Sequence, residues 1–510
     1  MIDQSFSFEA APEFVSPSQS VRWRQRLATL SFAVLAVALT IHLALPLLTL
    51  TAPFDLNYNE GWNAYHAARI LAGGPLYTGD VTAPVNYPFL SFYLTAAFAP
   101  WLGGVVIAGR ILSLAGLLVT AGAAGFIVQR LGGRRTEAAI TMIAVLGFWV
   151  VQARQWTAVD DPQALGQAFM TLALACHVGG ARSLRRLWAT ALLVGLGAFT
   201  KHNLIAIPVA ITLDLALHQR RSLLPWLGGV VGTLGALAGI SHLVAGGDFL
   251  REMLAPRAWH FINLERHTRK FLIGFKLPFV AMLLLVGGSC LERGTKLVGL
   301  YFVTAFLAGL GFSGGDGVSF NIYLDTTVAL AIGVGLALSH WRGWLDDGPQ
   351  WRRLFRALLP LLLLSPLITR ASDPLVRLRV LGSEGMPIAT AAADFARNKA
   401  IVERQPGPAI CENLLLCFAA DKPLSLDPFN SYEAFTAGHA DDTALVQAVA
   451  RGTYGAIEVR QPIRFQTNGQ GGRTIDLDPP IRFTDRFYAA VADHYRIIVE
   501  NSAGVVYVPR

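Results

Sequence analysis

The stretch Asp55-Leu-Asn-Tyr-Asn-Glu60-Gly-Trp-Asn-Ala-Tyr65 decides how the rest of the chain is interpreted. It follows an apolar run over residues 27–50 and places two carboxylates, Asp55 and Glu60, close together. An aromatic, amphipathic segment over residues 62–71 comes next and ends at Gly73-Gly74. An acidic loop beside a membrane span, followed by a helix that can lie at the interface, favours chemistry at the lipid–water boundary. A solvated loop is the plainer alternative.

The composition is that of a polytopic membrane protein. Of the 510 residues, 53% are hydrophobic and only 15% are charged, whereas soluble domains carry roughly 25% charged residues. The net charge of +8 comes from short Lys/Arg clusters between apolar runs, which is typical of cytoplasmic loops under the positive-inside rule. No stretch resembles a nucleic-acid-binding motif, so we expect membrane lipids and no nucleic acid among the partners.

About eleven apolar segments are predicted to span the membrane as helices. Arg22, Arg24 and Arg26 precede the first segment, so residues 1–26 are expected to be a cytoplasmic tail. The spans define a transmembrane module over residues 27–370, whose first outer loop covers residues 51–106. The segments lie at about residues 27–50, 107–128, 136–153, 163–179, 187–199, 204–217, 223–245, 271–290, 297–312, 319–339 and 357–370.

Two segments can be placed relative to the membrane in more than one way. The run around Tyr87-Pro-Phe-Leu-Ser-Phe-Tyr93 is apolar but short, and Pro100 interrupts it. We interpret it as interfacial or half-buried, because this keeps the basic cluster Arg130-Leu-Gly-Gly-Arg-Arg135 on the cytoplasmic side. The loop over residues 246–270 is then basic yet external, against the usual charge bias. A bound anionic lipid phosphate would explain this, and so would a misassigned span.

Residues 371–510 are expected to form an external soluble domain of the α/β or α+β class. Short segments rich in β-formers lie near residues 408–411, 454–459, 495–499 and 504–508, and turn formers bound them. Helical patterns lie between them at about 387–404 and 440–451. Cys411 and Cys417 could pair in an oxidising compartment, and the alternative that they stay reduced is left open.

The order of several motifs resembles that of the GT-C glycosyltransferases, membrane enzymes that take sugars from polyprenyl-phosphate carriers. The group includes protein O-mannosyltransferases and lipid A aminoarabinose transferases. The segment from Asn59 to Tyr77 is similar to their first outer loop, and the Pro- and Tyr-rich segment around Tyr87 follows as it does in them. The resemblance covers roughly residues 27–340. It departs at Asn59, where many relatives have Asp directly before Glu. Later motifs in the same order are the basic cluster at residues 130–135, Asp160-Asp161 and Phe199-Thr-Lys201.

The resemblance implies an inverting transfer of a sugar from a polyprenyl-phosphate carrier to an acceptor on the outer side of a bacterial inner membrane. A carboxylate deprotonates the acceptor as it attacks. Glu60 or Asp55 is the candidate base, with Asp160 or Asp161 as support or alternative. Cations then stabilise the departing phosphate, and Tyr65 and Tyr87 are candidates for stacking on the sugar or the prenyl chain, although such aromatics are also common at membrane interfaces. The candidate cations are Lys201, His202, Arg257 and Arg266.

This interpretation requires no metal or cofactor beyond the donor lipid. Paired carboxylates that hold a divalent metal through oxygen ligands are the alternative. The acceptor is left open as a lipid, a glycan or a protein. Two other functions remain: a membrane glycan ligase, which the basic loop 246–270 favours, and a lipid-linked sugar transporter or flippase. Transporters usually carry internal repeats, and none is evident in the sequence.

Overall fold

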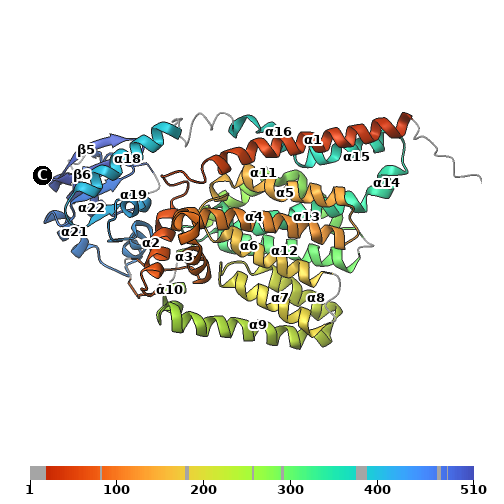
Figure 1. Cartoon of the computed structure of the whole chain (residues 1–510), viewed down its shortest axis with the longest axis horizontal. Helices are drawn as coiled ribbons and strands as arrows, with labels where there is room; N and C mark the ends of the chain where they lie inside the picture. The colour runs from red at the N-terminus through yellow and green to blue at the C-terminus, as the bar shows by residue number, and fades with distance from the viewer. Residues whose placement is uncertain are drawn as a thin grey trace, which may run out of the picture.

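A helical bundle and a smaller unit that contains a β-sheet make up the protein (Figure 1). The computed structural model describes residues 19–80, 83–178, 183–254, 258–288, 292–374, 388–467, 473–478 and 481–510. In Figure 1 the C-terminal unit, in blue, lies at one end of the bundle. The helices α2 (Asn59–Leu71) and α3 (Leu90–Leu102) of the first outer loop lie between the two.

Within the described residues, each apolar segment that the sequence predicts as a span is helical over most of its length. The short helices η1 (Arg154–Trp156), η2 (Ser241–Ala245), α10 (Phe249–Met253), η3 (Phe320–Tyr323) and α14 (Arg342–Asp346) connect them. The main helices of the bundle are α1 (Gln19–Leu48), α4 (Val105–Arg130), α5 (Arg135–Gln152), α6 (Gln163–His177), α7 (Leu184–Ala198), α8 (Ala206–His218), α9 (Arg220–Ile240), α11 (Phe261–Val286), α12 (Arg293–Ser313), α13 (Leu324–His340), α15 (Gln350–Leu363) and α16 (Ser365–Thr369).

The predicted number of eleven spans is not confirmed. Five of the described helices are long and apolar enough to cross a membrane, or six if the pair formed by α15 and α16, bent by 61°, counts as one span. For α6 and α7 the reason is helix length. The 15 residues of α6 and of α7 give helices of about 22 Å at 1.5 Å per residue, which is short of the roughly 30 Å of a bilayer core.

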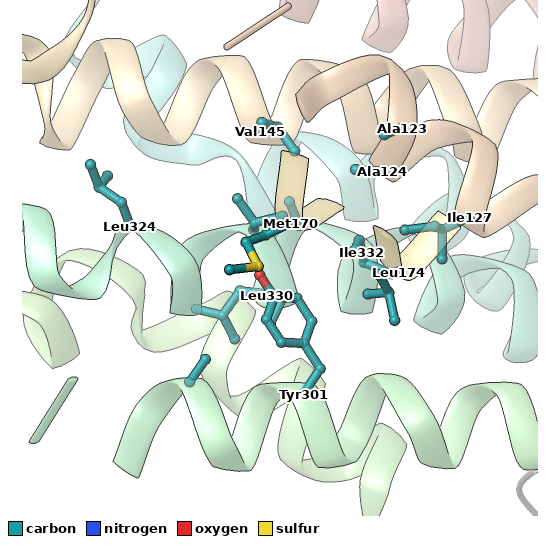
Figure 2. Packing of buried hydrophobic residues seen from close by; sticks show 14 of the residues in the cluster. Ala123, Ala124, Ile127, Val145, Met170, Leu174, Tyr301, Leu324, Leu330 and Ile332 are labelled. Carbon is teal, nitrogen blue, oxygen red and sulfur yellow. The ribbon is translucent and has the colours of Figure 1, made fainter. Parts of the chain in front are cut away.

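The bundle is organised around α13. In the apolar segment that includes α13, 94% of the residues are buried, whereas only 6% are buried in the segment that includes α9, at the outer edge. Figure 2 shows that α4, α5, α6, α12 and α13 all contribute side chains to one core, with Met170 of α6 and Tyr301 of α12 meeting near its centre. Close approach of α4 to α6 requires Gly116, because a Cβ there would lie 2.7 Å from the backbone of Ala164.

The C-terminal unit is built on a four-stranded mixed sheet in the order β1-β2-β6-β5. Strands β1 (Ala409–Cys411) and β2 (Ala456–Val459) are parallel, and β6 (Gly504–Pro509) pairs antiparallel with β2 and with β5 (Tyr495–Asn501). Side chains along β6 alternate between two hydrophobic clusters, one on each face. The predicted strand segments are therefore present, and both faces of the sheet are covered. The remaining elements are α18 (Ile388–Arg404), α19 (Leu414–Ala419), α20 (Pro428–Thr436), α21 (Thr443–Ala450), α22 (Asp485–His494) and the hairpin of β3 (Phe465–Thr467) and β4 (Arg473–Ile475).

The C-terminal unit packs directly on the first outer loop. Helix α19 lies so close to α2 that a Cβ on Gly61 would be 2.1 Å from the backbone nitrogen of Leu415. Trp62 shares a hydrophobic cluster with Leu414. A disulfide joins Cys411 to Cys417, and α19 therefore stays tied to the end of β1. As a result, the loop that carries Asp55 and Glu60 is enclosed between the bundle and the C-terminal unit.

Candidate active site

Glu60 lies in the first turn of α2 and is fully buried. Arg110 of α4 binds its carboxylate in a bidentate manner, with Nε donating to Oε1 and Nη2 donating to Oε2, both at 2.7 Å. The backbone amides of Leu56 and Asp160 donate to Oε2 and Oε1 at 2.7 and 3.0 Å. Each carboxylate oxygen therefore accepts two hydrogen bonds, one of them from a cation.

Arg110 was not identified from the sequence. Its guanidinium also donates to the backbone carbonyls of Ala52 at 2.7 Å and Phe54 at 2.8 Å, so it fixes the chain that leaves α1. A signal was available, since Arg110 is the one charged residue between residues 105 and 129. An ionisable side chain in such an apolar run is a candidate functional or positioning residue by default.

The Glu60 carboxylate joins the two acidic loops. Its amide donors, Leu56 and Asp160, are the chain neighbours of Asp55 and Asp161. Because both loops bond to one fixed carboxylate, the expected convergence of the first and second acidic loops is present. The loops do not, however, place all their acidic side chains in the same surroundings.

Asp161 faces a basic and aromatic group of residues. Its Oδ1 accepts from the Gln163 amide at 2.8 Å and lies 4.0 Å from the Lys201 Nζ. The Asn59 Nδ2 lies 3.4 Å from Oδ2. The Lys201 Nζ also lies 3.8 Å from the centre of the Tyr87 ring, a cation–π geometry. We refer to Asn59, Tyr87, Asp161 and Lys201 as the Lys201 cluster.

Asp160 points into a closed space. It lies against Gly109 of α4, where a Cβ would be 2.0 Å from its Oδ1. Burial raises the pKa of Asp160 well above its usual range, and the charges of Glu60 and Asp161 raise it further. The cavity beside Asp160 is about 10 Å³, about the smallest space that can hold one water molecule. Asp160 is therefore not placed to meet a sugar.

Asp55 borders a large cavity of about 760 Å³. Its Oδ1 accepts from the Asn413 Nδ2 of the C-terminal unit at 2.7 Å. Burial raises the pKa of Asp55, and the nearby Glu60 charge adds to the effect. Of the four carboxylates predicted from the sequence, Asp55 is the one that lines this cavity.

The other predicted residues lie outside the Lys201 cluster. Tyr65 contacts the C-terminal unit, where its hydroxyl donates to the Lys422 carbonyl at 2.7 Å. His202 is exposed, with its ring centre 6.5 Å from that of Tyr87. Arg266 is exposed near the start of α11, and none of the described hydrogen bonds or ion pairs joins it to the cluster. Arg257 lies outside the described residues.

A metal site is not evident in the part of the chain that the structure describes. No group of three or more His, Cys, Asp or Glu side chains there is arranged to hold an ion. Three of the four predicted carboxylates instead have separate polar partners: Arg110 for Glu60, Asn413 for Asp55 and Lys201 for Asp161.

Comparison with known proteins gives a match in structure. No family model and no curated protein matches the sequence. ArnT from Cupriavidus metallidurans, in the apo state, matches with a TM-score of 0.58 and 14% identity, and the match covers 96% of this chain and 98% of that one. The same protein bound to undecaprenyl phosphate matches over the same shares with a TM-score of 0.57 and 14% identity. The chain has the GT-C fold.

A second GT-C structure agrees. The archaeal oligosaccharyltransferase AglB from Archaeoglobus fulgidus, in complex with an inhibitory peptide and a dolichol-phosphate, matches with a TM-score of 0.51 and 12% identity over 95% of this chain and 80% of that one. The GT-C likeness thus extends beyond residues 27–340, where the sequence motifs lie, to the C-terminal unit. At these identities the likeness establishes the fold and not the substrates.

Proposed function

We propose that the protein is a glycosyltransferase that moves a sugar from a polyprenyl-phosphate carrier to an acceptor at the outer face of a bacterial inner membrane. The observation that carries the proposal is the arrangement around Glu60, which holds the loops of Asp55 and Asp161 together inside a GT-C fold. Support comes from the structural neighbours, since ArnT binds undecaprenyl phosphate and AglB a dolichol-phosphate.

Lys201 is the cation proposed to meet the carrier phosphate. Transfer breaks the bond between the anomeric carbon and a phosphate oxygen, so negative charge develops on that oxygen. A positioned ammonium stabilises this charge. The Tyr87 ring and the Asp161 carboxylate, at 3.8 and 4.0 Å from Nζ, hold Lys201 in place before the donor arrives. Asp161 therefore has a positioning role.

Asp55 is the proposed general base. Glu60 is poorly suited, because Arg110 and two backbone amides already occupy both of its oxygens. Asp55 borders open space, and burial raises its pKa toward the range in which a carboxylate accepts protons effectively. As the acceptor oxygen bonds to the anomeric carbon, its proton passes to Asp55 and the carrier phosphate leaves from the opposite face. The products are an inverted glycoside and the polyprenyl phosphate.

The proposed orientation places the C-terminal unit outside the cytoplasm. The disulfide between Cys411 and Cys417 supports this, because disulfides persist in oxidising compartments such as the periplasm. The cluster of Arg22, Arg24 and Arg26 in the first turns of α1 favours a cytoplasmic N-terminus.

Purified protein incubated with a panel of radiolabelled polyprenyl-phosphate sugars provides the test. We expect release of free polyprenyl phosphate together with a glycosylated product, and we expect Lys201→Gln and Asp55→Asn each to lower the rate at least 100-fold. Movement of the intact donor between leaflets without release of the carrier would instead identify a transporter. Transfer of a preassembled glycan, with no turnover of single-sugar donors, would identify a ligase.

A further inference from the structure

The cavity of about 760 Å³ lies in the seam between the bundle and the C-terminal unit, and we call it the seam cavity. Its volume is within the range of small-molecule sites. Part of its lining is formed by Leu45 and Pro46 in the last turn of α1 and by Thr49, which follows that helix. The neighbouring Leu47 and Leu48 of α1 are 52% and 67% exposed, so this part of the lining adjoins the lipid-facing surface of a candidate span.

The part of the seam cavity lining that lies in the C-terminal unit is mostly polar. The start of α18 adds apolar side chains there, and the polar lining residues of this unit are Glu412, Asn413, Glu458, Arg460, Arg482, Asn501 and Ser502. The apolar part at α1 and the polar part at the sheet suit an amphiphile, whose chain stays in the bilayer while its head group reaches the sheet.

The charges in the seam cavity are balanced. Its described lining residues include three carboxyl groups and three arginines, so their formal charges cancel, and the arginines do not form a wall of positive charge alone such as a polyanion site would need. The Arg482 guanidinium lies over the rings of Tyr58 at 4.7 Å and Phe429 at 5.0 Å, which positions it against aromatic faces. The charged lining residues are Asp55, Glu412, Glu458, Arg154, Arg460 and Arg482.

Asn413 fixes two of these carboxylates. Its side-chain amide donates to the Asp55 Oδ1 at 2.7 Å, and its backbone amide donates to the Glu458 Oε2 at 2.9 Å. Its own Oδ1 accepts from the Leu415 amide at 3.1 Å, at the start of α19. The Arg460 backbone amide similarly holds the Glu412 carboxylate at 2.9 Å. Carboxylates oriented in this way can accept hydrogen bonds from ligand hydroxyls.

We propose that the seam cavity is the acceptor site, and that the acceptor is a neutral, hydroxyl-rich head group on a lipid, that is, an uncharged glycolipid. The role of this ligand as the acceptor rests on the proposed function, whereas its chemical class is inferred from the residues that line the cavity. Carboxylate and amide oxygens bind the sugar hydroxyls, and Tyr58 and Phe395 provide apolar faces for the ring. A head group rich in phosphate would face Asp55, Glu412 and Glu458, which disfavours it.

Photocrosslinking in phosphatidylcholine nanodiscs tests the ligand class. The first probe is decyl maltoside with a diazirine in the alkyl chain, and the second is decyl phosphate with the same diazirine. We expect at least fivefold more crosslinking of the maltoside at equal concentration, mapped to peptides of α1, α18 or the β5–β6 turn. Equal labelling by the two probes, or labelling elsewhere on the protein, would overturn the proposal.

Variants in which a tryptophan side chain fills the seam cavity provide the matched comparison with the unaltered protein. Ala391 of α18 lines the cavity, whereas Ala393, two residues on, is exposed. Ala391→Trp should reduce maltoside crosslinking at least fivefold, and Ala393→Trp should leave it unchanged. Ala503→Trp, in the β5–β6 turn that also lines the cavity, is a second filled variant, so that misfolding of one variant does not decide the result. Unchanged crosslinking in both filled variants would refute the site.

A separate measurement distinguishes this inference from the proposed function. Retention of radiolabelled polyprenyl phosphate by the protein in the same nanodiscs measures binding of the donor's carrier lipid. Lys201→Gln should reduce this retention at least tenfold. If the carrier does not bind but the maltoside still crosslinks in the seam cavity, the proposed transferase fails and the glycolipid site stands. If the carrier binds normally but neither filled variant affects the maltoside, the glycolipid site fails alone.

Discussion

Glu60 and Arg110 form a bidentate ion pair with N–O distances of 2.7 Å, and both side chains are fully buried. The pair connects the first outer loop to α4, and the Glu60 oxygens also hold the amides of Leu56 and Asp160. A residue that the sequence suggests as a base is therefore the residue that positions the other candidates.

Loss of either partner should destabilise the protein. Removing one member of a buried pair leaves an uncompensated charge and costs about 3–5 kcal/mol. Arg110→Met and Glu60→Gln should each lower the unfolding temperature in detergent, measured by intrinsic fluorescence. Lys399→Ala, which breaks an exposed pair with Glu403 on α18, is the control and should change stability by less than about 1 kcal/mol. If Glu60→Gln lost activity with no change in stability, Glu60 would be the base after all.

Asp55→Asn should remove the proton acceptor while leaving the fold intact. General-base catalysis contributes roughly 100- to 10,000-fold, so we expect kcat to fall by that order with little change in the donor KM. The control is Asp493→Asn on the exposed face of α22, which should retain activity. A similar fall in both variants, or no fall in Asp55→Asn, would contradict the assignment.

The pH dependence of kcat provides a second test of Asp55 as the general base. Burial raises its pKa, so the carboxylate becomes protonated at a higher pH than an exposed Asp does. Because only the ionised form accepts a proton, activity should be full above this raised pKa and lost as the pH falls through it. The acid limb should therefore lie above the ordinary value of about 3.9. An acid limb at or below that value would exclude Asp55 as the titrating base.

Lys201→Gln should act mainly on the donor. The Lys201 side chain is only 3% exposed and lies between Asp161 and the Tyr87 ring. Without its charge we expect a higher KM for the polyprenyl-phosphate sugar as well as a lower kcat. Lys201→Arg should not restore activity, because a planar guanidinium is larger than an ammonium and the Lys201 Nζ is already enclosed by the Tyr87 ring at 3.8 Å and the Asp161 Oδ1 at 4.0 Å. Lys399→Gln, which is exposed, is the control. A normal donor KM in Lys201→Gln would remove Lys201 from the phosphate site.

The sequence predicts the helices and strands well because they depend on local patterns. The apolar run before Asp55 becomes α1, and the β-rich segment at 504–508 becomes β6. The contacts that define each side chain's role depend on distant partners. The Tyr65 hydroxyl bonds to Lys422, which is 357 residues away, and Asp55 bonds to Asn413, which is 358 residues away. No local pattern encodes such pairs, so the sequence predicts that the two acidic loops converge but not which partner each of Asp55, Glu60 and Asp161 has.

Reduction of the Cys411–Cys417 disulfide should affect the acceptor side selectively. The bond closes a loop with a sequence separation of 6 that contains Glu412 and Asn413. The chain-entropy relation gives about 2 kcal/mol for so short a loop. Replacing both cysteines with serine should lower the unfolding temperature and raise the acceptor KM, while binding of polyprenyl phosphate stays unchanged. A larger effect on donor binding than on the acceptor would contradict the placement of the acceptor in the seam cavity.

The orientation of the chain can be measured with two introduced cysteines. Ser372 follows α16 and Arg135 begins α5, and both are exposed. In a chain whose Cys176 and Cys290 are replaced by alanine, a membrane-impermeant maleimide should label Ser372→Cys in cells with a permeabilised outer membrane. Arg135→Cys should react only after the inner membrane is opened, because the basic residues around it favour the cytoplasm. The reverse pattern would place the C-terminal unit and its seam cavity inside the cell, where a donor displayed on the outer leaflet could not reach them.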